Sequence, residues 1–438
     1  MLNKQKYIIC LLCLIVCFLN DFQGFSQQLF PSDETVIKIW ETTGQNNNKV
    51  YVDYIHSVQM YHSGLKMSYP IMQLYGNSPL ELHFDDLDQD VHTYYYTIEH
   101  YDALWQRFDI NQASYLDGFF TNLLNDYEIS TGTVVPYRHY VLQIPNRDLS
   151  ITRSGNYLLK IFETTSDNPV ITQRFTVYED LVDLDVYMRT TNVASMQNSV
   201  HLLEFNINTS KINIADVFAD LQIAILPNNI WHLAETGIQP LFIRNNSISY
   251  QKEIAPLNEF RTINLKEVSL NYSEIQDIVV INSIQHVKLV PDAFRILERY
   301  RDVTDMNGLF YVEKFRAWDF DLQADYVWVY FSLQHDKPLL DGQVYVYGAL
   351  SDYSFSPSNI MVYNMDNKTY ENRMLLKQGF YDYYYVHVAN YDSRVDFERI
   401  EGSFAQTSNN YIIYVYFRDR SLGLDRLVGY NTVTSFPK

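Results

Sequence analysis

The chain contains 438 residues, with 33 basic and 52 acidic side chains and a formal net charge of −19. A negative field of this size repels nucleic acid and anionic lipid headgroups, which excludes nucleic-acid binding as the function. Tyrosine is the unusual component, with 37 residues against 25 phenylalanines and 5 tryptophans. Its ring packs while its hydroxyl stays hydrated, so this composition suits half-buried strands and wet interfaces.

Residues 1–26 have the pattern of a cleavable signal peptide. Two lysines precede an apolar run over residues 7–19, which is as long as a signal-peptide core and too short to cross a bilayer comfortably. Small residues at Gly24 and Ser26 predict cleavage after Ser26. No later stretch has 18 uninterrupted apolar residues, so the sequence predicts an exported protein without a transmembrane helix.

All three cysteines, Cys10, Cys13 and Cys17, lie inside the predicted signal. Valine stands directly before Cys17, where a lipoprotein signal needs a small residue, so we expect no lipid anchor. Removing two lysines and one aspartate leaves 31 basic and 51 acidic residues, a charge of −20. The mature chain would have neither disulfides nor thiolate metal ligands, and its stability would come from burial in several domains.

Short β-branched or aromatic runs, separated by turn residues, dominate the rest of the chain. This spacing, without helical patterns between the runs, predicts an all-β fold of tandem immunoglobulin- or fibronectin-like β-sandwich domains. We predict an N-terminal sandwich over 27–180, a middle β domain over 181–300 and a C-terminal sandwich over 301–438. No linker is rich in Pro, Gly or Ser, so we expect the domains to pack against each other.

The predicted strands of the N-terminal sandwich are 68–74, 80–84, 94–99, 137–144, 157–162 and 172–178. In the fifth strand, Tyr157, Leu159 and Ile161 alternate to one side. The entry through Ser154 and Gly155 is typical of a sandwich strand that carries a corner tyrosine. We therefore expect Tyr157 to be buried, with its hydroxyl bonded to nearby backbone.

The predicted strands of the middle domain are 184–189, 201–207, 221–226, 241–243 and 260–265. Isolated prolines mark the turns between them. Residues 292–301 have helical character, and we predict a short helix there, at the junction with the C-terminal domain. The predicted C-terminal strands are 326–333, 343–347, 359–363, 370–376, 381–388 and 411–417. The N-terminal and C-terminal domains share Tyr-rich strands that follow a glycine turn.

Asp86, Asp88 and Asp90 repeat the first half of a calcium loop, where alternate acids converge on a cation. Val91 replaces the glycine of the sharp turn and Thr97 replaces the bidentate glutamate, which excludes an EF-hand. A looser calcium site over 86–90 and a solvated turn between two strands both remain open.

His83, His92 and His100 lie close together in the sequence but are spaced by nine and eight residues. This spacing does not place two imidazoles on one helical face, and no His-Glu-x-x-His motif is present, so we expect no transition-metal site among them.

Motifs for catalysis and nucleotide binding are missing as well. The mature sequence has no Gly-x-Ser-x-Gly, no P-loop and no Gly-x-Gly-x-x-Gly after a strand. A Ser-His-Asp triad and a carboxylate pair for sugar hydrolysis have no fixed spacing, so the sequence leaves both open. We predict a non-enzyme with no catalytic residues, no metal and no cofactor.

One aromatic loop has the composition of an interface. Tyr115, Leu116, Asp117 and Phe119 surround Gly118 between predicted strands. Aromatic loops on a stiff scaffold often form binding hot spots, so we predict these four side chains as partner-binding residues. Packing of the loop onto its own core is the alternative.

Eight segments in a fixed order carry a family resemblance. They are FDDLD (84–88), YYYTIEH (94–100), YLDGF (115–119), SGNYLLK (154–160), VYVYG (344–348), LLKQG (375–379), IEGS (400–403) and DRLVGY (425–430). Together they resemble the plug proteins of the type IX secretion system of Bacteroidetes, over essentially the whole mature chain. The chain departs from many relatives at Tyr101, where they carry cysteine, and at Leu104, where they carry aspartate before the tryptophan.

The resemblance implies a soluble periplasmic protein that closes the periplasmic opening of the outer-membrane translocon barrel when no cargo-shuttle subunit is engaged. That barrel would be the partner, and no small-molecule substrate, nucleic acid or cofactor would be needed.

Two alternatives remain open. The segment YGALSDY (347–353) is similar to a loop of glycogen-binding sandwich modules, which would make the chain an exported carbohydrate-binding protein. Tyr-rich alternating strands also occur in outer-membrane proteins, although charged residues on both faces of the middle strands disfavour that class.

Overall fold

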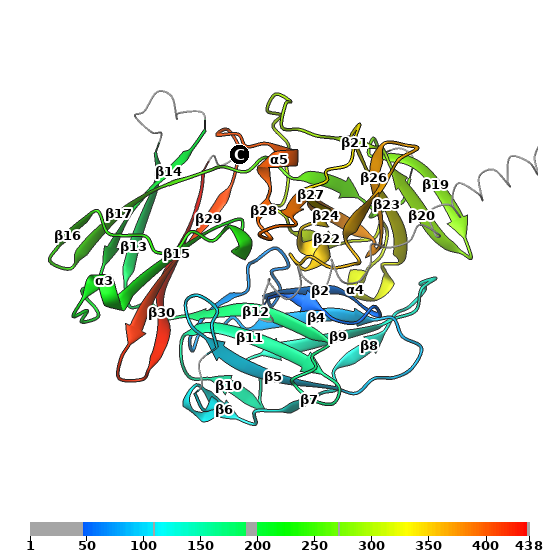
Figure 1. Ribbon diagram of the computed structural model, residues 1–438. Coiled ribbons are helices and arrows are strands. Elements are labelled where there is room, and N and C mark those ends of the chain that lie inside the picture. The colour runs from blue at the N-terminus through cyan, green and yellow to red at the C-terminus, as the bar shows by residue number, and fades with distance from the viewer. Residues whose placement is uncertain (1–46, 108–109, 190–198, 270–271, 436–438) are drawn as a thin grey trace, which may run out of the picture. The chain divides into compact units, whose positions relative to one another are not determined.

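The computed structural model describes residues 47–107, 110–189, 199–269 and 272–435 (Figure 1). Residues 43–438 form one compact unit, and the predicted signal peptide lies outside the described residues. Strands dominate and the α-helices in the described ranges are single turns of four residues, so the all-β prediction is confirmed. No helix in those ranges is long and apolar enough to cross a membrane.

Strands β1–β12 build the first sandwich, whose two sheets share one core. One sheet has the order β1-β12-β11-β5-β7 with β3 added parallel to β12, and the other has the order β2-β4-β9-β8. A short pair, β6 and β10, completes this part. The elements are β1 (Lys49–Val50), β2 (Ile55–His62), β3 (Ile71–Gln73), β4 (Leu80–Asp86), β5 (Tyr94–Tyr101), η1 (Gln112–Ser114), β6 (Leu116–Gly118), β7 (Asn122–Leu124), β8 (Tyr127–Ile129), β9 (Arg138–Ile144), β10 (Leu149–Ile151), β11 (Gly155–Phe162) and β12 (Ile171–Tyr178).

The middle sandwich combines strands from distant parts of the sequence. The sheet β13-β14-β17-β16 shares a core with the sheet β15-β29-β30, whose last two strands come from the end of the chain. The elements are β13 (Asp183–Arg189), β14 (His201–Asn208), α3 (Val217–Asp220), β15 (Leu221–Pro227), η2 (Trp231–Leu233), β16 (Phe242–Arg244), β17 (Ser247–Ile254), β29 (Asn410–Asp419) and β30 (Leu424–Thr434). Figure 1 shows this mixture as green strands beside red ones.

The remaining strands form an eleven-stranded sheet with the main order β18-β27-β24-β25-β26-β23-β20-β19. The elements are β18 (Arg261–Asn264), β19 (Ile275–Ile281), β20 (Ile284–Leu289), β21 (Asp292–Ala293), β22 (Phe310–Val312), α4 (Phe320–Gln323), β23 (Tyr326–Gln334), β24 (Gly342–Tyr347), η3 (Ala349–Ser351), β25 (Ile360–Asn364), β26 (Thr369–Lys377), β27 (Gly379–Ala389), β28 (Val395–Asp396) and α5 (Glu398–Glu401). Strand pairing therefore crosses the predicted boundary at residue 301 in both directions: β18–β20 join this sheet, and β29–β30 leave it.

The helix predicted over residues 292–301 is wrong. The segment begins with β21, which pairs with β23, and continues without helix. Side-chain contacts explain the extended start, because the Asp292 carboxylate accepts hydrogen bonds from Arg261, Tyr383 and Tyr385. Leu297 is almost fully exposed, so no apolar helical face is buried there. Tertiary contacts have overridden local helix propensity.

Two tyrosines explain why the N-terminal and C-terminal domains share Tyr-rich strands that follow a glycine turn. Tyr157 is buried and its hydroxyl donates to the Arg153 carbonyl at 2.8 Å, as predicted. Tyr381 donates in the same way to the carbonyl four residues before it. Each tyrosine follows a glycine by two residues, and a Cβ on Gly155 or Gly379 would lie 2.3 or 2.2 Å from a neighbouring atom. The lack of a side chain at the glycine therefore allows another part of the chain to pack closely against it. The tyrosine hydroxyl then hydrogen-bonds the backbone just before the strand begins.

Candidate functional site

The structure divides the predicted partner-binding loop into an inner and an outer half. Tyr115 and Leu116 are each 3% exposed and belong to the core of the first sandwich. Asp117 is exposed and Phe119 is 71% exposed, while the backbone of the loop is fixed by pairing of β6 with β10. This corrects the expectation that Tyr115 and Leu116 are available to a partner. Partner contact by Asp117 and Phe119 stays a prediction.

The acidic loop after β4 already has a cation on its carbonyl groups. The guanidinium of Arg138 donates to the backbone oxygens of Asp88, Gln89 and Asp90 at 2.8–3.0 Å. The carboxylate of Asp86 accepts from the Asp88 backbone N–H and the Tyr94 hydroxyl. The Asp88 carboxylate in turn lies 3.1 Å from Nε2 of His92. The acids of the loop thus contact neighbouring protein groups, which supports the solvated-turn interpretation.

The three histidines that lie close in the sequence do not converge. His92 is held between Asp88 and Glu163, at 3.1 and 3.2 Å. His100 is buried edge-on against the Tyr157 ring, and burial lowers its pKa to about 4. His83 instead faces His139, which sequence spacing had not indicated.

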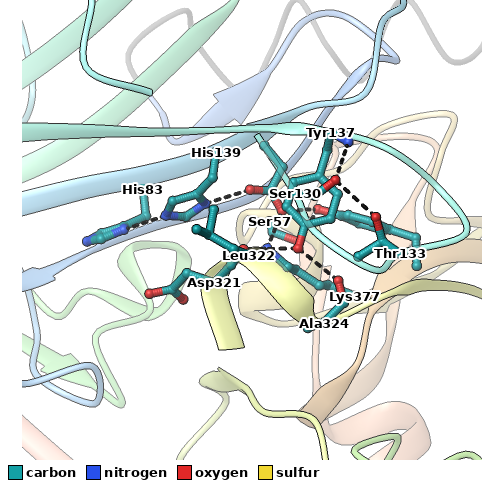
Figure 2. Close-up of polar contacts among 12 residues, drawn as sticks. Ser57, His83, Ser130, Thr133, Tyr137, His139, Asp321, Leu322, Ala324 and Lys377 are labelled. Carbon is teal, nitrogen blue, oxygen red and sulfur yellow. Dashed lines mark hydrogen bonds and ion pairs between the residues drawn. The ribbon is translucent and has the colours of Figure 1, made fainter. Parts of the chain in front are cut away.

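A buried carboxylate joins the first sandwich to the eleven-stranded sheet. Asp85 on β4 is fully buried and accepts hydrogen bonds from Lys377 Nζ and the Tyr326 hydroxyl, each at 2.6 Å. Its other oxygen lies 2.6 Å from Nδ1 of His139 (Figure 2). Burial alone would raise the pKa of Asp85, but Lys377 and His139 lower it below its ordinary value. The carboxylate therefore stays charged; the Lys377 ammonium compensates it, and it has polar partners from both sides. We call Asp85, Lys377, Tyr326 and His139 the Asp85 junction.

A loop of the first sandwich encloses this junction. The Asp325 carboxylate, two residues after α4, accepts the backbone N–H groups of Val134 and Val135 at 2.7 and 3.1 Å. The Tyr137 hydroxyl donates to two backbone carbonyls of the α4 segment, at 3.0 and 2.9 Å. The Tyr137 ring also lies 4.1 Å from Lys377 Nζ, within cation–π distance (Figure 2). These contacts fix the orientation of the first sandwich against α4.

Strand β30 makes a second connection, between the first and middle sandwiches. Arg426 donates two hydrogen bonds to the Glu179 carboxylate, at 2.9 and 2.7 Å. The neighbouring Asp425 is buried and accepts the Ala103 backbone N–H at 3.0 Å. The last strand of the chain therefore ties the end of β12 and the turn after β5 to the middle sandwich.

A cavity of about 90 Å³ is lined by residues of the first sandwich, the middle sandwich and the part of the chain that forms the eleven-stranded sheet. The guanidinium of Arg174 on β12 lies 4.1 Å from the ring centroid of Trp105 and 5.5 Å from that of Trp231. Burial lowers the pKa of Arg174 to about 9, and burial raises the pKa of Asp352 in the cavity wall to about 7. Sites for small molecules usually have roughly 300–1,000 Å³, so this cavity has room for a few waters and not for a substrate of ordinary size.

Comparison with known proteins decides the family. A crystal structure described as a hypothetical protein from Parabacteroides merdae ATCC 43184 is similar to this chain, with 32% identity and a TM-score of 0.85. The match covers 89% of this chain and 100% of the other. No curated protein matches the sequence. Residues 55–179, from β2 to just beyond β12, match the family model of the type 9 secretion system plug protein first domain. The chain belongs to the type IX secretion system plug protein family.

Membership in the plug protein family gives the chain a role in type IX secretion, and this family is a non-enzymatic component of that system. The segments that first suggested the family contain the residues that hold the parts together. FDDLD contains Asp85, LLKQG contains Lys377, IEGS contains Glu401 and DRLVGY contains Arg426. Glu401 is buried and binds Arg261 and Arg295 within the eleven-stranded sheet. The recognisable residues of this plug-family chain are therefore mostly structural ones.

The loop that suggested sugar binding does not present an aromatic platform. Tyr347 is fully buried, and its hydroxyl lies 2.8 Å from Nδ1 of His232. Tyr353 lies in the wall of the cavity, and its hydroxyl donates to the Gly308 carbonyl at 2.8 Å. Sugar-binding sandwiches need rings whose faces are open to solvent, so these residues do not support the carbohydrate-binding alternative.

Proposed function

We propose that this plug-family protein is periplasmic and that it binds and occludes the periplasmic opening of the type IX outer-membrane translocon barrel. The observation that carries the proposal is that the two sandwiches and the eleven-stranded sheet exchange strands and form one compact unit. An occluding body acts through a fixed shape, and buried charged contacts such as the Asp85 junction and the Glu179–Arg426 pair favour a fixed arrangement. The family match supplies the secretion system in which that shape acts.

Phe119 is our candidate for a contact with the translocon. Its ring is 71% exposed, yet its backbone N–H donates to the Asp148 carbonyl at 3.0 Å. Gly118 before it has φ of +110°, and a Cβ there would lie 2.1 Å from the same carbonyl oxygen. The ring is therefore presented from a fixed backbone, which lowers the entropy lost when a partner buries it.

The test of occlusion compares three strains: one without the protein, one with the wild type and one with Phe119→Ala. We expect the strain without the protein to be sensitive to vancomycin, because an unoccluded translocon admits large antibiotics. Phe119→Ala should fold normally and co-purify less with the barrel. A strain without the protein that stays resistant would refute occlusion.

The matched control is Tyr391→Ala. Tyr391 is fully exposed on a loop of the eleven-stranded sheet, so the change removes an equally open ring at another place. We expect co-purification to be unchanged. If Tyr391→Ala weakens co-purification and Phe119→Ala does not, the contact lies on the eleven-stranded sheet instead of on the first sandwich.

A further inference from the structure

Three side chains from three elements converge beside the Asp85 junction. His83 on β4, His139 on β9 and Asp321 in α4 each place one nitrogen or oxygen atom within 4.8 Å of the other two. Nδ1 of His83 faces Nε2 of His139 at 3.0 Å, and Asp321 lies below them in Figure 2. Two of these residues belong to the first sandwich and the third to α4, so the cluster spans the junction.

The far nitrogen of each imidazole faces a carboxylate. Nδ1 of His139 lies 2.6 Å from Asp85, and Nε2 of His83 lies 3.4 Å from Glu81. With an N–H on each far nitrogen, the two facing nitrogens both carry lone pairs. Lone pairs 3.0 Å apart repel each other unless a proton or a metal ion lies between them. Imidazoles that bind metals are usually oriented in this way, by a carboxylate on the second N–H.

Asp321 approaches the imidazoles from the other side of the junction. Both of its oxygens lie close to Lys66 Nζ, at 2.7 and 2.9 Å. One oxygen can therefore bind a cation while the other keeps its hydrogen bond to Lys66. The Asp321 side chain is 30% exposed, against 11% for His83 and 9% for His139. A cation would thus enter from the Asp321 side, which also leaves room for a water ligand.

We propose that His83, His139 and Asp321 bind a divalent transition metal, with Zn²⁺ as the best match, and that this metal fastens the first sandwich to α4. Two imidazoles and one carboxylate suit Zn²⁺, whereas Ca²⁺ and Mg²⁺ prefer oxygen ligands alone. Tetrahedral zinc with bonds of roughly 2.0–2.1 Å separates two nitrogens by about 3.3–3.4 Å. The imidazoles therefore need to move apart by only a few tenths of an ångström.

The test is titration calorimetry with ZnCl₂ on the purified chain after EDTA treatment. Alkylation with iodoacetamide first removes the three cysteines of residues 1–26 as competing ligands. We expect one Zn²⁺ per chain and a melting temperature that rises with Zn²⁺, because a ligand bound only to the folded state stabilises it. Ca²⁺ at the same concentration should do neither. A wild type that binds no stoichiometric Zn²⁺ overturns the proposal.

The variants His83→Gln and Asp321→Asn locate the ion. Each should weaken Zn²⁺ binding at least about tenfold. Both variants keep roughly the size of the original side chain, and Asp321→Asn keeps one of the two oxygens that accept from Lys66. The matched control is His92→Gln, since His92 also lies between two carboxylates but, among the described residues, belongs to no such cluster of metal ligands. It should bind Zn²⁺ as the wild type does. If His83→Gln does not fold in EDTA, Asp321→Asn alone decides, and unchanged binding in the folded variant overturns the assignment.

Discussion

The Tyr157 hydroxyl shows how single residues are satisfied in a core built largely of tyrosine. It donates to Arg153 at 2.8 Å, and its ring stacks on Phe175 with centroids 5.4 Å apart. We expect Tyr157→Phe to lower the free energy of unfolding by about 1 kcal/mol and Tyr157→Ala by about 3 kcal/mol or more. Urea unfolding measures both, with Tyr391→Phe as the exposed control. Equal stability of Tyr157→Phe and wild type would show that the hydrogen bond contributes nothing.

Asp382 on β27 carries a pH-dependent contribution to stability. It is fully buried, one oxygen accepts the backbone N–H groups of Met306 and Gly308, and the other has no hydrogen-bond partner among the described residues. Burial, with a smaller effect of Asp305, raises its pKa from the ordinary 3.8 to about 8. The folded state thus holds a proton that the unfolded state releases, so this stability is complete below pH 4 and is lost as the pH rises to about 8.

The substitution Asp382→Asn should remove that dependence. The asparagine oxygen can accept the same two N–H groups, but the side chain does not titrate. We expect the wild type to lose stability between pH 5 and pH 8 by at most about 1.4 kcal/mol per pH unit, and the variant to lose clearly less. Melting temperatures of both proteins at the two pH values give the comparison. Parallel curves would mean that Asp382 is charged throughout.

At the scale of elements, the Asp85 junction makes a prediction about β4 and β26. Lys377→Met leaves the buried Asp85 carboxylate without its ammonium partner, which typically costs about 3–5 kcal/mol. The exposed pair Lys368–Asp336, at 3.7 Å, is the control, and Lys368→Met should cost less than about 1 kcal/mol. Chemical unfolding of the two variants tests this. Equal effects would mean that Asp85 is compensated by Tyr326 and His139 without the lysine.

The success of sequence reasoning also differs between elements. Strands such as β11 and β27 were predictable because each is a short aromatic or β-branched run that begins at a glycine, although nearly all of their side chains are buried. Strand β2 was missed, since Ser57 adopts a φ of +54° and a bulge between His56 and Gln59 shifts the alternation. The pairing of β29 with β15 could not be predicted from the local sequence pattern. It depends on which strand, distant in the sequence, has an unpaired edge beside β29.

The candidate sites were harder to predict for the same reason. His83 and His139 are 56 residues apart, and only the register of β4 with β9, where Asp85 lies opposite His139, brings them together. The sequence spacing relates His83 only to His92 and His100, and that spacing indicates no metal site. Tyr115 was misplaced because a single turn, η1, and the pairing of β6 with β10 bring it inside.

At the scale of the whole molecule, the formal charge of −19, or −20 for the predicted mature chain, acts on association. The two sandwiches and the eleven-stranded sheet form one compact unit, so these charges approach a partner together. If the proposed translocon opening has a basic rim, their summed field steers the encounter. Steering acts on the association rate, and salt screens it over a Debye length of about 10 Å at 0.1 M.

We therefore expect the association rate with the solubilised translocon to fall several-fold between about 0.05 and 0.3 M NaCl, with little change in the dissociation rate. Surface plasmon resonance at a series of salt concentrations measures both rates. Asp117→Asn, beside Phe119, should flatten the salt dependence more than Asp336→Asn, whose side chain is 91% exposed on the eleven-stranded sheet. An association rate independent of salt would show that the negative field serves solubility alone, and a larger effect of Asp336→Asn would place the contact away from Phe119.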